Sequence, residues 1–107
     1  MKPSKVKFIS ERLEKEFEKL DETDPIKKAI KRAIKDLQQD AFFGIQIPKR
    51  LFPKEYFQKY QINNLWKYDL PDGWRLIYTV TSENKVQIVT AILEWFNHPE
   101  YEKRFHY

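Results

Sequence analysis

The spacing of apolar residues near the N-terminus predicts a short strand followed by two helices. Residues 6–9 alternate as a strand, and Ser10 is suited to cap a helix that runs to about Leu20. Asp24 and Pro25 supply an N-cap and a first-turn proline, which together signal the start of a second helix. Because so short a turn joins them, we expect the two helices to form an antiparallel hairpin.

The second helix is expected to be amphipathic. Its apolar face comprises Ile26, Ile30, Ala33, Leu37 and Ala41. Its opposite side is basic and comprises Lys27, Lys28, Lys31, Arg32 and Lys35. Gly44 is the expected C-terminal stop, because glycine adopts the left-handed conformation that ends many helices. A basic connector follows, with a strand-like stretch at residues 45–47 and one or two helical turns at residues 54–60.

Beyond residue 64 the hydrophobic period becomes two, which predicts a β-hairpin. Apolar side chains occupy one face of its two strands, namely Trp66, Tyr68, Leu70, Trp74, Leu76, Tyr78 and Val80. A loop at residues 71–73 pairs Leu70 with Trp74 and Tyr68 with Leu76, so the apolar faces coincide. The other face then carries Lys67, Asp69 and Arg75.

A second turn at residues 82–85 leads to a strand at residues 86–96, which is apolar on both faces and is therefore expected to be central. Pairing across this turn sets Val89, Ala91 and Leu93 against Tyr78, Leu76 and Trp74. The reverse face then brings Glu94 near Arg75. A short terminal helix is expected after Asn97, because Pro99 suits a first helical turn.

These elements predict an α+β fold, in which an N-terminal helical hairpin packs on a mostly antiparallel sheet of about four strands, with a short C-terminal helix. The 107 residues fit one domain, 1–107. With no cysteine and two histidines, the chain lacks the ligands of a thiolate or histidine-built metal site, and we expect no metal or other cofactor.

Charge and hydropathy indicate where the protein is located and which kinds of partner it binds. No stretch approaches the roughly 20 apolar residues that span a bilayer, and the charged N-terminus has no signal-peptide core. We therefore expect a cytoplasmic protein with no membrane partner. The net charge of +4 favours an acidic partner such as RNA, DNA or an acidic polypeptide.

Three segments of the C-terminal half carry a family resemblance. They are Asn64-Leu65-Trp66-Lys67-Tyr68-Asp69-Leu70, Gly73-Trp74-Arg75-Leu76-Ile77-Tyr78 and Ile92-Leu93-Glu94-Trp95-Phe96-Asn97-His98-Pro99-Glu100-Tyr101. Together with the order of elements, two helices before a sheet that ends in a His- and Tyr-bearing tail, they resemble toxins of the RelE/ParE type. The likeness in sequence covers residues 64–107, and the preceding helices are similar in topology only.

The resemblance implies the toxin of a toxin-antitoxin pair, which enters the ribosomal A site, where it meets ribosomal RNA, and cleaves messenger RNA. A cognate antitoxin protein would wrap and neutralise it. The family's usual chemistry is metal-free attack of the ribose 2′-OH on the adjacent phosphate. This reaction needs a base for the 2′-OH, an acid for the 5′-oxygen, and positive charge at the phosphate.

Arg75 and His98 are the first candidates for these roles. Arg75 matches the family arginine, and a guanidinium suits phosphate oxygens because its forked donors bind two of them at once. Its alternative role is that of a surface partner of Asp69 or Glu94. His98 is the only histidine before the C-terminal dipeptide, and imidazole exchanges protons near neutral pH. Its alternative role is that of a helix N-cap or a hydrogen-bonded strand end.

Tyr101 and Glu94 are further catalytic candidates. Tyr101 matches a family tyrosine that stacks on a base or assists proton transfer, but its four-residue spacing from Phe105 equally suits a core position. Glu94 would serve as the general base that some members take from a carboxylate, or as an ion pair that positions Arg75. An alternative catalytic pair is His106-Tyr107, which is similar to the His-Tyr ending of YoeB-type toxins.

Basic residues outside the catalytic set are candidates for gripping RNA. They are Lys49, Arg50 and Lys54 in the connector and Lys67 on the face of Arg75. The basic side of the second helix has three interpretations: a solvated face, a ribosomal RNA contact, or an antitoxin docking surface.

The main alternative to an endonuclease is a binding module. A ParE-like topoisomerase inhibitor shares this fold without the cleavage residues, and a degenerate toxin would keep only antitoxin and operator binding. A generic basic RNA-binding domain is a third possibility. We expect the catalytic candidates to converge with basic residues on one concave face in an endonuclease, and to scatter in a binding module.

Overall fold

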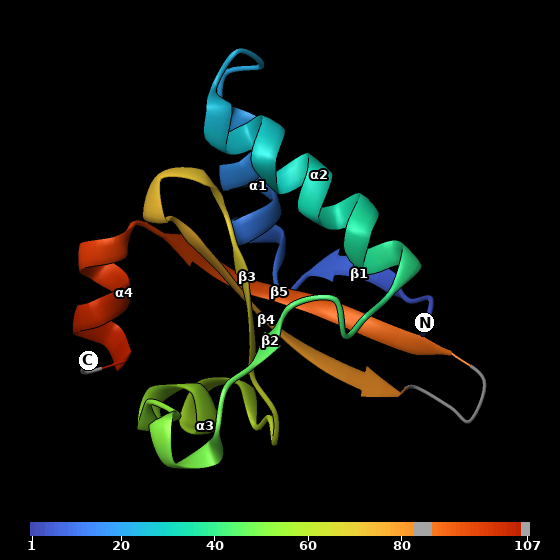
Figure 1. Cartoon of the computed structure of the whole chain (residues 1–107), viewed down its shortest axis with the longest axis vertical. Helices are drawn as coiled ribbons and strands as arrows, with labels where there is room; N and C mark the ends of the chain where they lie inside the picture. The colour runs from blue at the N-terminus through green and yellow to red at the C-terminus, as the bar shows by residue number, and fades with distance from the viewer. Residues whose placement is uncertain (83–86, 106–107) are drawn as a thin grey trace.

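A five-stranded sheet in the order β1-β5-β4-β3-β2 forms the centre of the molecule (Figure 1). The computed structural model describes residues 1–82 and 87–105. The strands are β1 (Lys5–Phe8), β2 (Ile45–Gln46), β3 (Trp66–Asp69), β4 (Arg75–Ser82) and β5 (Ile88–Phe96). β1 runs parallel to β5, and the other described pairings are antiparallel. The α+β class is confirmed, but the count of about four strands is wrong because the short edge strand β2 also joins the sheet.

The first two helices begin where their capping residues predicted, and two further helices follow. They are α1 (Glu11–Lys19), α2 (Pro25–Gln39), α3 (Lys54–Tyr60) and α4 (His98–Phe105), with short 3₁₀ turns η1 (Lys49–Leu51) and η2 (Pro71–Gly73). The Ser10 hydroxyl accepts the Leu13 N–H at 3.1 Å, and the Asp24 carboxylate accepts the Ile26 N–H at 2.9 Å. Within the described ranges, no helix has the length and apolar character needed to cross a membrane.

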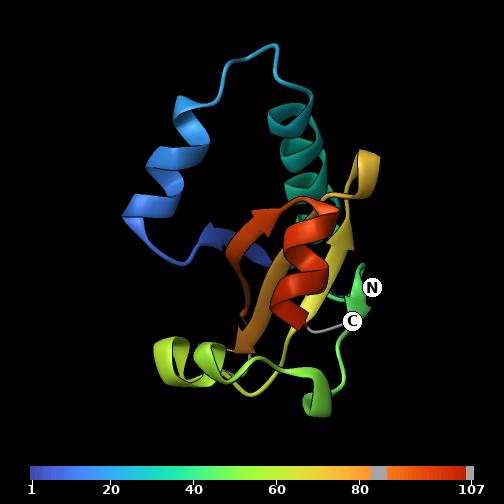
Figure 2. The same ribbon diagram turned by 90° about the vertical axis from the view of Figure 1, so that its left-hand side faces the viewer.

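The first two helices diverge from the loop that joins them (Figure 2). Both contribute apolar side chains to one face of the sheet, but a close antiparallel hairpin is not confirmed. α2 also ends earlier than predicted, at Gln39, because Asp40 leaves the helix and its carboxylate accepts the Phe42 N–H at 3.1 Å. Gly44 therefore does not stop this helix. It allows a close approach instead, since a Cβ there would lie 2.3 Å from the Lys67 carbonyl oxygen.

Each face of the sheet has its own core. The core between the sheet and the helices α1 and α2 contains Ile30, Ala33, Leu37, Leu70, Leu76, Tyr78 and Ile92. The core between the sheet and the helices α3 and α4 contains Ile47, Phe52, Tyr56, Leu65, Ile77, Leu93, Phe96, Tyr101 and Phe105. β5 contributes to both sets, so its expected burial on two faces is confirmed. Trp95 packs toward the first helices, with its ring centroid 6.4 Å from that of Phe17.

The register of the β3–β4 hairpin agrees with the prediction, whereas that of β4–β5 does not. Tyr68 pairs with Leu76, and the Leu70 N–H donates to the Trp74 carbonyl at 2.9 Å. Across the next pairing, Thr79 lies opposite Ala91 and Thr81 opposite Val89, so the predicted partners of these residues were wrong. Ser82 pairs with Ile88, which requires a longer connection than the predicted turn, and a bulge near Leu93 shifts the register again.

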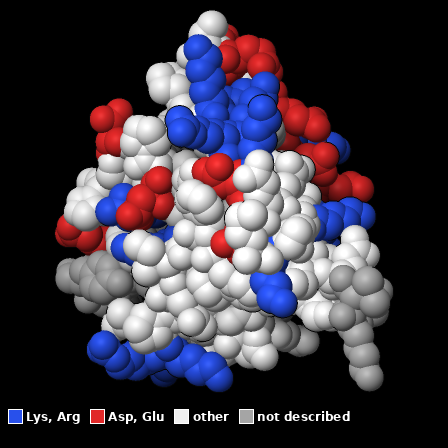
Figure 3. All heavy atoms as spheres, turned by 45° about the vertical axis from the view of Figure 1, so that its right-hand side comes forward, with Lys and Arg blue, Asp and Glu red and all other residues white. Residues whose placement is uncertain are grey.

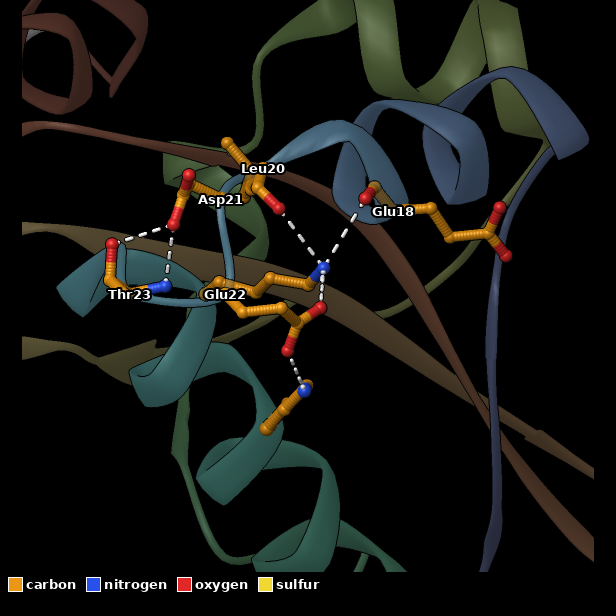
Figure 4. Close-up of polar contacts among 7 residues, drawn as sticks. Glu18, Leu20, Asp21, Glu22 and Thr23 are labelled. Carbon is orange, nitrogen blue, oxygen red and sulfur yellow. Dashed lines mark hydrogen bonds and ion pairs between the residues drawn. The ribbon is translucent and has the colours of Figure 1, made fainter.

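A buried lysine ties α2 to the end of α1 (Figure 4). The Lys27 ammonium donates to the backbone carbonyls of Glu18 at 3.2 Å and Leu20 at 3.0 Å, and to the Glu22 carboxylate. These acceptors satisfy its three donors and cap the C-terminal turn of α1. Lys27 was wrongly assigned to the exposed basic side of α2. Lys28, Lys31, Arg32 and Lys35 remain exposed there.

Replacing Lys27 by Met should lower the free energy of unfolding by about 1–3 kcal/mol, because two helix-end carbonyls lose their donor. Lys28→Met removes the same charge from an exposed site of the same helix and should change stability by less than about 0.5 kcal/mol. Urea unfolding of both variants measures the difference. Equal losses would show that the Lys27 contacts do not stabilise the junction.

The Glu22 carboxylate gives this junction a pH dependence. Hydrogen bonds from Lys27 and Lys31 lower the pKa of Glu22 from 4.5 to about 2. Its contribution to stability should therefore be complete above pH 4.5 and disappear as the pH falls through about 2. The difference in Tm between wild type and Glu22→Gln should be constant at neutral pH and shrink in this acidic range. A difference that persists unchanged at the acid end would contradict the ion-pair origin.

Candidate functional site

Two cations from neighbouring strands meet beneath α4. Lys67 on β3 and Arg75 at the start of β4 point to the α4 side of the sheet, as the hairpin alternation predicted. The Lys67 Nζ and the Arg75 Cζ each lie 5.4 Å from the centroid of the Tyr101 ring. Positive groups at this distance are attracted by the negative face of an aromatic ring. One tyrosine of α4 thus holds both cations at the same end of the sheet.

One carboxylate is shared between these two cations. The Asp69 Oδ1 lies 3.0 Å from the Arg75 Nε and 4.0 Å from the Lys67 Nζ. The Arg75 Nε is nevertheless buried without a hydrogen-bond acceptor among the described residues, because the close contact with Asp69 lacks hydrogen-bond geometry. Its Nη1 donates to the Trp74 carbonyl at 3.1 Å. The predicted alternative role of Arg75, as a partner of Asp69, is present in the structure.

His98 stands at the same end of the sheet, at the first position of α4. A Cβ built on Gly73, two residues before Arg75, would lie 3.0 Å from the His98 Cβ. The N-terminus of the helix is capped by Asn97, whose side chain accepts the Glu100 N–H at 3.1 Å, so His98 is not the cap. The His98 imidazole is half-exposed and its Nε2 contacts the Glu102 carboxylate, one turn along α4.

Tyr101 lies in the core, with 2% of its surface exposed. Its ring packs against Phe105 at 4.9 Å and Phe96 at 6.1 Å between centroids. Of the two roles that the sequence left open for Tyr101, the structure therefore shows the core position. Stacking of this ring on a nucleobase would require α4 to move.

Glu94 is bound by side chains of α3 and α4 rather than by Arg75. Its carboxylate accepts a hydrogen bond from the Tyr56 hydroxyl of α3 and another from the Arg104 Nη1 of α4, the latter at 2.7 Å. Burial, reinforced by the Glu94 charge, raises the pKa of Tyr56 well above its ordinary range, so this hydroxyl stays protonated and donates. The bulge places Glu94 opposite Ile77 in the β4–β5 ladder, whereas Arg75 lies opposite Phe96. Glu94 and Arg75 therefore share a face of the sheet but are not cross-strand partners. The sequence did not reveal this polar contact, because its partners come from three separate elements.

The basic connector lies apart from the Lys67–Arg75 pair. Lys49 and Arg50 are exposed on η1, and Lys54 is exposed at the start of α3. Figure 2 shows these segments at the opposite end of α4 from η2, the turn that leads into Arg75. The alternative pair His106 and Tyr107 lies outside the described residues.

The geometry therefore concentrates charge and proton-exchanging chemistry in one small area. Lys67 and Arg75 can neutralise an anion. His98 lies against Gly73, two residues before Arg75, and carries an imidazole that can exchange protons. Comparison of the chain with protein-family models, with curated proteins and with solved structures finds no match.

Proposed function

We propose that this chain is a RelE/ParE-type toxin that cleaves messenger RNA on the ribosome. The observation that carries the proposal is the gathering of Lys67, Arg75 and His98 at one end of the sheet, around the start of α4. A phosphodiester substrate needs positive charge and a proton-exchanging group within reach of one another. This end of the sheet supplies both.

The proposed reaction is metal-free transesterification within the RNA. The 2′-oxygen attacks the adjacent phosphorus, a P–O2′ bond forms and the P–O5′ bond breaks, which leaves a cyclic phosphate. Arg75 and Lys67 would stabilise the negative charge that builds on the phosphate oxygens. His98 would exchange the proton that leaves the 2′-OH or reaches the 5′-oxygen.

The RNA strand would make further contacts with a separate basic surface, at the opposite end of α4 from this centre. Three basic residues are exposed on η1 and α3, namely Lys49, Arg50 and Lys54. They can contact RNA phosphates and would take no part in the cleavage reaction. Phosphate contacts of this kind position a strand but do not select its sequence.

A second function is favoured by the state of the other two catalytic candidates. Tyr101 is buried, and Glu94 is engaged by Tyr56 and Arg104. A non-cleaving binding module, such as a ParE-like topoisomerase inhibitor or a degenerate toxin, needs neither residue free. Detection of RNA cleavage separates this function from the endonuclease.

The expected antitoxin would find a matching surface beside α2. Three apolar side chains at and just before the start of β2 are about half-exposed, namely Phe42, Phe43 and Ile45, and we call them the aromatic edge. A groove between α2 and β3 continues from Phe43 and is lined by Lys28 and Arg32 of the basic side as well as by Asp36 and Asp69. Figure 3 shows a group of cations near the top of the molecule, above a largely uncharged surface in which single acidic and basic groups are exposed. An antitoxin segment with an apolar stripe and acidic flanks would complement both features.

Arg75→Ala should reduce cleavage of a translated message by about 100-fold or more, because the developing phosphate charge loses its strongest partner. Primer extension on message from cells induced for each variant measures this. Arg12→Ala, which removes an exposed arginine of α1, is the matched control and should cleave as wild type does. Intact message with wild-type protein, together with arrested growth, would instead support the non-cleaving function.

Phe43→Glu should weaken binding of the proposed antitoxin by about tenfold or more, because it sets a charge in an apolar contact. Phe57→Glu is the control, since Phe57 is similarly exposed but lies on α3. Titration of the purified partner against each variant gives the affinities. Equal weakening by the two changes would contradict docking on the aromatic edge.

A further inference from the structure

The carboxylate of Asp69 occupies the contact that an RNA phosphate needs. Asp69 lies directly opposite Arg75 in the β3–β4 ladder and two residues after Lys67 on the same strand face. It therefore reaches both cations, at 3.0 Å from the Arg75 Nε and 4.0 Å from the Lys67 Nζ. Neither cation has another carboxylate within ion-pair distance among the described residues.

Burial of the two cations limits access to them. The side chains of Lys67 and Arg75 are 20% and 17% exposed, whereas that of Asp69 is 50% exposed. Charges that are mostly buried are screened less by salt than surface charges are. The Tyr101 ring also covers part of both cations, so an incoming anion and Asp69 must compete for the remainder.

The contact between Asp69 and Arg75 lacks a hydrogen bond, so another anion can replace the Asp69 carboxylate. The buried Arg75 Nε–H has no hydrogen-bond acceptor among the described residues despite the nearness of Asp69. A buried donor without an acceptor is unfavourable, so an oxygen in a better direction would be preferred over the present one. Because Asp69 is half-exposed, its carboxylate can turn into solvent when another anion arrives.

We propose that Asp69 is a positioning residue that orders Arg75 and Lys67 in the free protein and is displaced from them by an RNA phosphate. The inference rests on the proposed function, because it assigns the two cations to a phosphate. It adds a competitor built into the site: two cations face one carboxylate, and RNA must replace that carboxylate before it gains their full charge.

The test compares two variants that change the net charge equally. Asp69→Asn removes the competing carboxylate, and Asp72→Asn removes an exposed carboxylate from the adjacent turn η2. Asp72 has a φ of 59°, a left-handed conformation that asparagine also adopts readily. Binding of a fluorescent, fully 2′-O-methylated RNA oligonucleotide is measured by anisotropy over a series of salt concentrations. The methyl groups block the 2′-OH, so binding is measured without cleavage.

Asp69→Asn should bind this RNA about threefold tighter or more than Asp72→Asn does, and Asp69→Glu should return the affinity toward that of wild type. The direction is informative, because loss of a merely structural contact would weaken binding. Equal affinities of the two Asn variants, or weaker binding by Asp69→Asn, would overturn the role of Asp69 while leaving the proposed function intact. Absence of salt-dependent binding by wild type and by every variant would overturn the RNA-directed function itself.

Discussion

Side-chain alternation along the β3–β4 hairpin decides which residues meet beneath α4. The ladder sets Asp69 opposite Arg75 and Tyr68 opposite Leu76, so this charged pair and the neighbouring apolar pair lie on opposite faces. The apolar pairs are committed to the core with α2. The charged residues consequently have only the α4 side available, and a shift of one residue would exchange the two sets. The cationic site therefore depends on the packing of the opposite face.

The same constraint explains how far the sheet could be predicted from the sequence. The loop at residues 71–73 is short enough to fix the register, and the alternation of seven apolar residues left one consistent pairing. The β4–β5 pairing was mispredicted because Ser82 pairs with Ile88 across a longer connection. The bulge near Leu93 adds a second shift, which a strict two-residue period does not contain.

Contacts between elements were the least accessible to sequence reasoning. The caps at Ser10 and Asp24 involve neighbours in the chain, and local pattern was sufficient to find them. Lys27 looked like part of a basic stripe because helical periodicity gives only its angular position, whereas its partners are carbonyls at the end of α1. For Tyr101, helical spacing allowed two interpretations, and only the packing against Phe96 and Phe105 distinguishes them.

The placement of α4 connects this packing to the proposed chemistry. His98 belongs to α4, so its position relative to Arg75 depends on how the helix is attached to the sheet. Tyr101 and Phe105 attach it through the core, and Arg104 attaches it through the Glu94 carboxylate. Tyr101 and Glu94, which the family resemblance suggested as reactants, thus hold in place the helix that carries the histidine. The chemistry proposed here is left to Arg75, Lys67 and His98, whose side chains these attachments bring to one end of the sheet.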